Sequence, residues 1–180
     1  MASVALLRAV NVAGRNQIQM ADLRRLAESV GLRSVRTVLQ SGNLVFEGGG
    51  GDLARLEARL ERAAAADLGL STTFLVRSAA EWQAIVRSNP FPDEASTAPA
   101  KVLLVCLKET VASGRVEDLQ SAIVGREVVL GAGRHVYIVY PDGVGRSKLT
   151  SSVIERRLGS ASTARNWNTV LKLREMLGSD

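Results

Sequence analysis

Two hydrophobic periods alternate over residues 1–78, and this pattern limits the folds open to the chain more than any other feature. Val4–Val10 is expected to be an apolar strand, and apolar residues then recur at helical spacing from Met20 to Val30. A period of two follows over Val35–Leu39, and the Ser41–Gly42 turn leads into a third apolar strand. A second helical stripe and a strand at Thr72–Val76 complete a β-α-β-β-α-β order.

That order predicts an α+β fold with a ferredoxin-like sheet, in which the third strand lies antiparallel between the first two. We expect Asp52 to cap the second helix and Ser78–Glu81 to form a capping box at the start of the third. We therefore place a first subdomain at residues 1–78 and a second α+β subdomain, with C-terminal helices, at residues 79–180.

The second half is expected to repeat a β-α-β-β-α core, which would make the fold a duplication with two mainly antiparallel sheets and helices packed on them. Pro92–Pro99 is expected to be a loop. After it we predict a strand at 101–107 and a helix at 116–123. Two strands at 127–130 and 136–140 would be joined by a Gly131–Gly133 turn, and two helices would follow at 147–158 and from 163 onward.

Composition indicates a globular protein, because 46% of the 180 residues are hydrophobic and 23% are charged. The apolar run Val102–Leu107 is far shorter than the ~20 residues that span a bilayer, so we expect no membrane partner. The first residues are expected to form a strand and not a signal peptide. The single cysteine, Cys106, is expected to be a buried thiol, and the predicted location is cytoplasmic.

The net charge of +5 is compatible with an anionic partner, although the basic residues are spread along the chain without a dense arm. Biased genomic composition would also explain this excess, because arginine outnumbers lysine. Aromatic residues make up 4% of the chain, and the third strand offers only Phe46 for stacking on bases. Nucleic acid is therefore a weakly supported partner, and the sequence makes no prediction about oligomeric state.

A first group of polar residues is expected to meet at one edge of the predicted sheet. The first two strands would run parallel, so their carboxyl ends and the turn between strands two and three share that edge. An arginine, three amides and a hydroxyl would converge there to bind an anion, namely Arg8, Asn11, Gln40, Ser41 and Asn43. The alternative is that these residues only cap strands and fix turns.

Two further motifs suggest anion sites at helix starts. Arg146, Ser147 and Lys148 follow a glycine-rich turn, although their spacing matches neither a Walker A loop nor a dinucleotide fingerprint. Arg165, Asn166 and Asn168 surround Trp167, which is most simply a core residue, while Thr163 or Asn166 would serve as an N-cap. For both motifs the alternative is a purely structural turn or cap.

Catalytic candidates are few. His135 is the only histidine, and its expected place is a solvated turn, so we predict no metal site and no cofactor. The acidic residues near the motifs, Asp142 and Glu155, are more simply turn and surface residues. A lysine base at Lys148 would need a depressed pKa.

Five motifs in order resemble domain-of-unknown-function family 1697 over nearly the whole chain. They lie at Leu6–Gly14, Gln40–Phe46, Asn89–Phe91, Ser147–Leu149 and Thr163–Thr169. Ala9 and Ala13 depart from the pattern, because the family often has glycine at both positions. The resemblance implies a small bacterial cytosolic protein with an α+β fold built from ferredoxin-like pieces, and it supplies no catalytic assignment.

Three functions remain open from the sequence. The first is a binding module for an anionic ligand, either a phosphorylated or carboxylated small molecule or nucleic acid. The second is a structural protein in which the polar motifs hold the two halves together, with Arg77 at their junction. The third is a metal-independent enzyme acting on a small anionic substrate.

Overall fold

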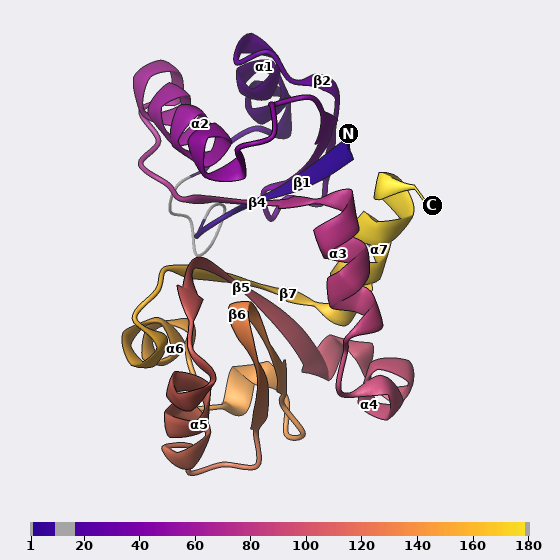
Figure 1. The fold of residues 1–180 in the computed structure, drawn as a ribbon, viewed down its shortest axis with the longest axis vertical. Coiled ribbons are helices and arrows are strands. Elements are labelled where there is room, and N and C mark those ends of the chain that lie inside the picture. The colour runs from indigo at the N-terminus through magenta and orange to yellow at the C-terminus, as the bar shows by residue number, and fades with distance from the viewer. Residues whose placement is uncertain (1, 10–16, 179–180) are drawn as a thin grey trace. The chain divides into compact units, whose positions relative to one another are not determined.

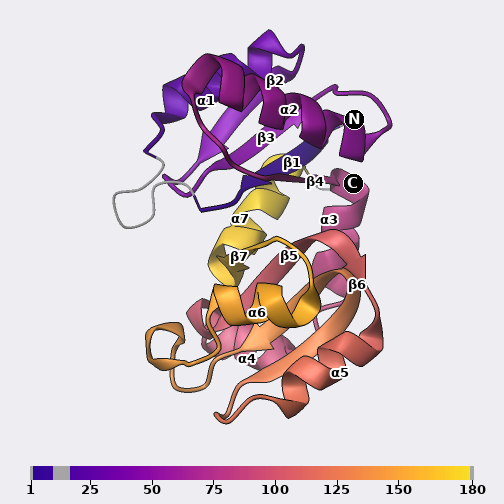
Figure 2. The ribbon, with the colours of Figure 1, turned by 90° about the vertical axis from the view of Figure 1, so that its left-hand side faces the viewer.

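A computed structural model of the chain describes residues 2–9 and 17–178. The chain divides into two compact units, which are described separately below (Figures 1 and 2). Unit 1 comprises Met1–Ile85 and Leu173–Asp180, and unit 2 comprises Val86–Lys172. Helices and antiparallel sheets are present in both units, so the predicted α+β class is confirmed.

Unit 1 contains a four-stranded sheet with the order β2-β3-β1-β4. Strand β3 is hydrogen-bonded to β1 and to β2 and is antiparallel to both, as the sequence predicted. Its elements are β1 (Ala2–Leu7), α1 (Met20–Ser29), β2 (Arg33–Val38), β3 (Asn43–Glu47), α2 (Leu53–Leu68), β4 (Phe74–Ser78) and most of α3 (Ala79–Arg87).

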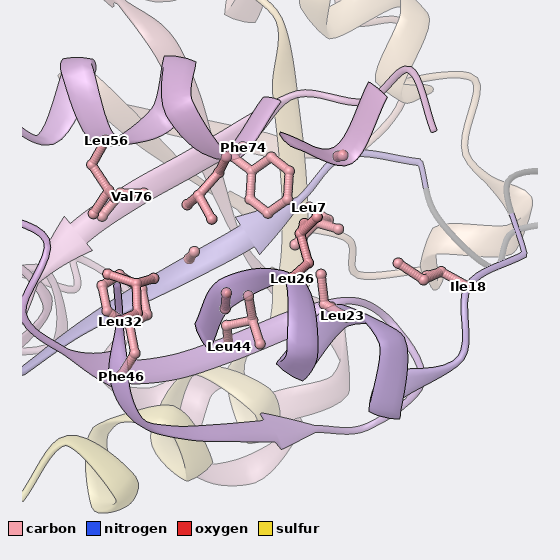
Figure 3. Close-up of a cluster of buried hydrophobic side chains, with 14 of the residues drawn as sticks. Leu7, Ile18, Leu23, Leu26, Leu32, Leu44, Phe46, Leu56, Phe74 and Val76 are labelled. Atoms are coloured by element: carbon pink, nitrogen blue, oxygen red, sulfur yellow. The ribbon is translucent and has the colours of Figure 1, made fainter. Parts of the chain in front are cut away.

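The core of unit 1 lies between one face of this sheet and the helices α1 and α2 (Figure 3). Alternate strand residues such as Leu7, Leu44 and Phe74 are at most 1% exposed. Leu23 and Leu60 face them from the two helices. The first helix thus contributes the apolar stripe that its periodicity predicted.

The caps expected in unit 1 are present. The Asp52 carboxylate accepts a hydrogen bond from the Arg55 N–H at 3.0 Å, which starts α2. Ser78 and Glu81 form the predicted capping box, with the Glu81 carboxylate accepting from the Ser78 N–H at 2.7 Å. These contacts are local in sequence, and for that reason the sequence alone identified them.

Three glutamates protect the outer edge of strand β4, which is the last strand of the sheet formed by the described residues. Glu61 accepts a hydrogen bond from the Phe74 N–H at 3.0 Å, and Glu57 accepts one from the Val76 N–H at 2.7 Å. The capping-box glutamate does the same for Ser78. The donors that would pair with a foreign strand are therefore satisfied within the unit.

Arg77 lies inside β4 and not after it, which corrects the sequence-based placement. Its guanidinium Nη1 is 4.0 Å from a Glu57 carboxylate oxygen, and both side chains are 2% exposed. Arg77 also donates to the Val76 carbonyl at 2.8 Å. This buried ion pair makes Glu57 responsible for both a strand-edge hydrogen bond and charge compensation.

Unit 2 contains a three-stranded antiparallel sheet with the order β6-β5-β7. Helices α5 and α6 cover one face, where Val105, Ile138 and Leu158 are buried. The elements of this part of the chain are α4 (Pro92–Thr97), the short helix Pro99–Lys101, β5 (Val102–Val111), α5 (Ser113–Ser121), β6 (Val128–Val139), the short helix Val144–Arg146, α6 (Ser151–Leu158), β7 (Ser162–Asn166) and the start of α7 (Trp167–Leu177).

The expected hairpin around Gly131 and Gly133 is wrong. Both glycines lie within the single long strand β6, which pairs with β5 through an irregular register between Cys106 and Val111. Gly131 has a φ of 138°, and a Cβ there would come within 2.9 Å of the backbone of His135 and Val136. Glycine is needed at position 131 because the strand bends there and the backbone of His135 and Val136 lies close, and the chain does not reverse its direction.

Strand β7 was missed, because its residues were assigned to the last helix. Ser162–Asn166 instead pairs with β5, and α7 begins only at Trp167. The order in this unit is therefore β-α-β-α-β, and the predicted repeat of the first half does not hold. Strand pairing decided this point, since residues 162–166 carry no apolar alternation.

One helix lies where a loop was expected, and another helix begins later than predicted. Residues Pro92–Thr97 form helix α4 and not a loop, with proline at its first turn followed by Asp93 and Glu94. Such an arrangement favours a helix start even without an apolar stripe. Helix α6 begins at Ser151, four residues later than expected.

Among residues 2–9 and 17–178, no helix is both long enough and apolar enough to cross a membrane.

The strand-edge glutamates yield a matched pair of variants. Glu57→Ala leaves a buried strand N–H and a buried guanidinium without their carboxylate, so we expect it to lower the free energy of unfolding by about 3 kcal/mol. Glu61→Ala removes one edge hydrogen bond and is expected to cost about 1 kcal/mol. Urea unfolding followed by Trp82 fluorescence in a Trp167→Phe background measures both, and equal losses would contradict the special role of Glu57.

Candidate functional site

A groove in unit 2 is the strongest candidate for a functional site. It has a volume of about 320 Å³, which lies at the lower end of the range for small-molecule pockets. Its walls come from the end of α5 with the turn that follows, from the loop between β6 and α6, and from α6 itself. The predicted motif Arg146, Ser147 and Lys148 lies on the second of these walls.

A short network of hydrogen bonds holds the motif against the rest of the unit. The Ser147 hydroxyl donates to the Glu127 carboxylate and accepts from the Leu149 N–H at 2.9 Å. The buried Tyr140 hydroxyl donates to the Leu149 carbonyl at 3.1 Å. Ser147 is thus a structural anchor of the loop, and it leaves its two neighbours exposed at the groove.

Glu127 is in turn positioned by the segment before β6. The Gln120 carboxamide donates to the Glu127 carbonyl at 3.3 Å and accepts from the Val129 N–H at 2.5 Å. A Cβ at Gly125 would collide with the Glu127 carboxylate. Glycine at this position therefore leaves room for the carboxylate that receives the Ser147 hydroxyl.

The charges around the groove are unbalanced. Its lining contains four basic and two acidic side chains. Both acids are engaged, because Asp142 pairs with Arg126 at 3.0 Å and Glu127 accepts from Ser147. Within the described residues, three lining cations have side chains that make no hydrogen bond or ion pair, namely Arg146, Lys148 and Arg157.

Sequence reasoning missed Arg157, Arg126 and Glu127 as members of this site. Helical spacing could have found Arg157, since it follows Val153 by four residues on the same face of α6. Glu127 and Arg126 lie in the turn before β6, and no local pattern points from that turn to the loop around Ser147. Tertiary packing alone brings them together.

The first predicted cluster lies at the sheet edge of unit 1, as strand order required. The Leu7 N–H donates to the Gly42 carbonyl at 2.9 Å, which places Arg8 beside the turn that carries Gln40 and Ser41. The Arg8 backbone is further fixed by Thr72 and Thr73, whose hydroxyl and carbonyl group lie 2.7 and 3.0 Å away. Asn11 lies outside the described residues.

Asn43 serves the turn itself. Its side-chain amide is fully buried and donates to the Val38 carbonyl at 2.8 Å and to the Ser41 hydroxyl at 2.9 Å. Gln40 is exposed and lines a separate hollow of about 410 Å³ in unit 1. Arg8 and the turn with Gln40 and Ser41 therefore lie close together at this edge, and the buried Asn43 amide forms hydrogen bonds within the protein.

The third motif does not line the groove of unit 2. Arg165 lies on β7, is 8% exposed, and donates to the Thr163 hydroxyl and the Ala164 carbonyl, both at 2.8 Å. Burial lowers the pKa of Arg165 to about 10, while the neighbouring Cys106 acts in the opposite direction. Asn168 is exposed.

Asn166 is the N-cap of α7, as predicted. Its carboxamide oxygen accepts from the Thr169 N–H and from the Thr169 hydroxyl, each at 3.1 Å. Trp167 is buried, in agreement with its expected core position.

The single histidine and the single cysteine occupy opposite positions on neighbouring strands. Cys106 is fully buried, as expected, and is the register partner of His135. His135 lies within β6 and contacts the Tyr137 ring edge-on, with centroids 5.3 Å apart, so its predicted place in a solvated turn is wrong. Over the described ranges, no group of three His, Cys, Asp or Glu side chains is arranged to hold a metal ion.

Comparison with known proteins establishes the family. The model of DUF1697, described as a protein of unknown function, matches residues 1–137. The chain belongs to this family. No curated protein matches the DUF1697 chain.

A solved structure shows the same fold. It is that of conserved bacterial protein SP0830 from Streptococcus pneumoniae, with a TM-score of 0.77 and 23% sequence identity, and the alignment covers 98% of each chain. At this identity the likeness concerns the fold alone.

Tyrosine titration tests the packing around the groove. The chain has two tyrosines, and burial raises the pKa of Tyr140 to about 12, with the negative charge of Glu127 as a smaller cause. Burial raises the pKa of Tyr137 to about 12 as well. We expect tyrosinate absorbance of the native protein to appear near pH 12, and Tyr140→Phe to halve its amplitude.

The sign of the linked stability change follows from these values. Each folded pKa lies above the ordinary value of 10.0, so the contribution of the neutral phenols to stability is complete below pH 10 and is lost as the pH rises through 12. Tyrosinate absorbance that rises near pH 10, while circular dichroism still reports a folded protein, would contradict the buried positions.

Proposed function

We propose that this DUF1697 protein binds a small anionic ligand in the groove of unit 2. The observation that carries the proposal is the surplus of positive charge around a formed cavity. Both lining acids have partners, whereas the side chains of Arg146, Lys148 and Arg157 make no ion pair within the described ranges. Charge-assisted hydrogen bonds to phosphate or carboxylate are the contacts that such groups favour.

The start of α6 adds to this preference. The hydroxyl of its N-cap residue, Thr150, is hydrogen-bonded to the Ser152 hydroxyl at 3.0 Å and caps no N–H group of the helix, and Val153 in the first turn lines the groove. The first N–H groups of a helix and its dipole attract negative charge. The helix start would therefore add to the attraction that the cationic side chains exert on an anion, and it does not make a binding site by itself.

The structural alternative is favoured at two of the sequence-predicted positions. Asn43 and Arg165 are buried and hydrogen-bonded inside their own units. We therefore propose internal structural roles for these two residues and keep ligand contact for the groove.

The third interpretation, a metal-independent enzyme, loses two of its candidate bases. Asp142 is paired with Arg126, and Glu155 accepts hydrogen bonds from the Ser162 N–H at 2.7 Å and the Ser162 hydroxyl at 3.3 Å. Lys148 remains at the groove as a cation, and we propose binding, not proton transfer, as its role.

Thermal denaturation with a panel of anions tests the proposed function. Inorganic phosphate, glucose 6-phosphate, AMP and hexanoate are compared with sodium chloride at equal ionic strength, which removes general screening. At a concentration of ~100 times Kd, a bound anion stabilises the native state by about 2.7 kcal/mol, and we expect the Tm to rise by about 5 °C.

Two double variants, which each remove two positive charges, test whether the anion binds at the groove. Lys148→Ala with Arg157→Ala removes two groove cations, and we expect at least a tenfold loss of affinity for any anion that stabilises the native protein. Arg24→Ala with Arg62→Ala removes two exposed cations from helices of unit 1 and should leave binding unchanged. No stabilisation by any anion, or equal losses in both variants, would refute the proposal.

A further inference from the structure

The uncharged part of the groove is aliphatic. Six of its lining residues are Leu119, Ala122, Ile123, Val124, Leu149 and Val153, and no aromatic ring is found among the lining residues that the structure describes. Leu119 and Leu149 are buried, whereas Val124 is 93% exposed, so this surface runs from the core of the unit out to solvent. An exposed apolar side chain at the rim of a cationic cavity is available to cover part of a ligand.

The hydroxyl of Ser147 and the carboxylate of Glu127, which could recognise the hydroxyls of a sugar, already have hydrogen-bond partners inside the protein. The Ser147 hydroxyl has a donor and an acceptor partner, and the Glu127 carboxylate receives that hydroxyl. Ligand hydroxyls placed against the aliphatic wall would lose their hydrogen bonds to water without replacement. Nor does the lining offer an aromatic face on which a nucleobase could stack.

The size of the groove limits the length of its occupant. At roughly 30 Å³ for each non-hydrogen atom, the share of one water molecule in the liquid, the cavity of about 320 Å³ holds roughly ten such atoms. An eight-carbon carboxylate has that size. Longer chains would extend past Val124 into solvent.

We propose that the ligand is an unbranched aliphatic anion of about six to eight carbons, whose head group meets the cations and whose chain lies on the aliphatic wall. This inference rests on the proposed function and narrows it to one chemical class. Charge complementarity selects the head group, and the aliphatic wall, which has no hydrogen-bonding side chain, selects the tail.

A series of straight-chain carboxylates at equal ionic strength tests the inference. Acetate, hexanoate, octanoate and dodecanoate, each below its micelle concentration, are titrated into the intact protein and followed by isothermal calorimetry. Each buried methylene contributes a factor of about four in affinity, so octanoate should bind about fifteenfold more tightly than hexanoate. The gain should stop at dodecanoate, and neutral 1-octanol should bind at least tenfold more weakly than octanoate.

Variants of the aliphatic wall supply the matched control. Val153→Thr replaces a methyl group by a hydroxyl and makes the wall polar, and Val124→Ser changes a side chain that is 93% exposed, so we expect little change in stability there. Both should weaken octanoate binding severalfold and leave phosphate binding unchanged. Lys148→Ala with Arg157→Ala should weaken both ligands.

The outcomes separate the two claims. If neither phosphate nor any carboxylate binds, the proposed function itself fails. If phosphate binds and octanoate binds no more tightly than acetate, only the aliphatic class is overturned. Octanoate binding that is insensitive to both wall variants would also overturn it, because the chain would then lie elsewhere.

Discussion

The hydrogen bond between the Ser147 hydroxyl and the Glu127 carboxylate is the contact on which the candidate site depends. It joins the loop after β6 to the turn before β6, two segments separated by the whole length of that strand. The same hydroxyl orders the loop by accepting the Leu149 N–H. Together with the Arg126–Asp142 ion pair, which joins the same two segments, and the hydrogen bond from Tyr140 to the Leu149 carbonyl, this contact holds the loop that carries Arg146 and Lys148 in place.

This contact also orients the one acidic side chain of the proposed anion site that has no cationic partner among the described residues. Glu127 keeps its negative charge, turns an oxygen toward the Ser147 hydroxyl and lies beside Gly125, where a Cβ would collide with its carboxylate. Asp142 is neutralised by Arg126. The remaining cations therefore determine the potential of the groove, although the sum of charges over the whole lining is modest. In the sheet of unit 1, glutamates have a different use, since there they satisfy the outer N–H groups of an edge strand.

Local patterns predicted much of unit 1, although the order of its sheet, β2-β3-β1-β4, differs from the order of the strands in sequence. The caps at Asp52 and Ser78, the apolar stripe of α1 and the insertion of β3 all depend on near neighbours or on strand order. In unit 2, β7 has no apolar alternation, and only its pairing with β5 makes it a strand. Gly131 and Gly133 were assigned to a turn, because a glycine that permits a bend within a strand has the same local pattern as one that reverses the chain.

The sequence by itself determined the α+β class, the family and one part of the candidate site, the Arg146–Lys148 motif, because periodicity, caps and motifs are properties of short segments. Only the tertiary structure decided that Arg157 and Glu127 join this motif, and that Asn43 and Arg165 turn inward to bond within their own units. The physical reason is that charge balance and burial belong to surfaces assembled from distant segments. No spacing along the chain records which of its cations will have a partner.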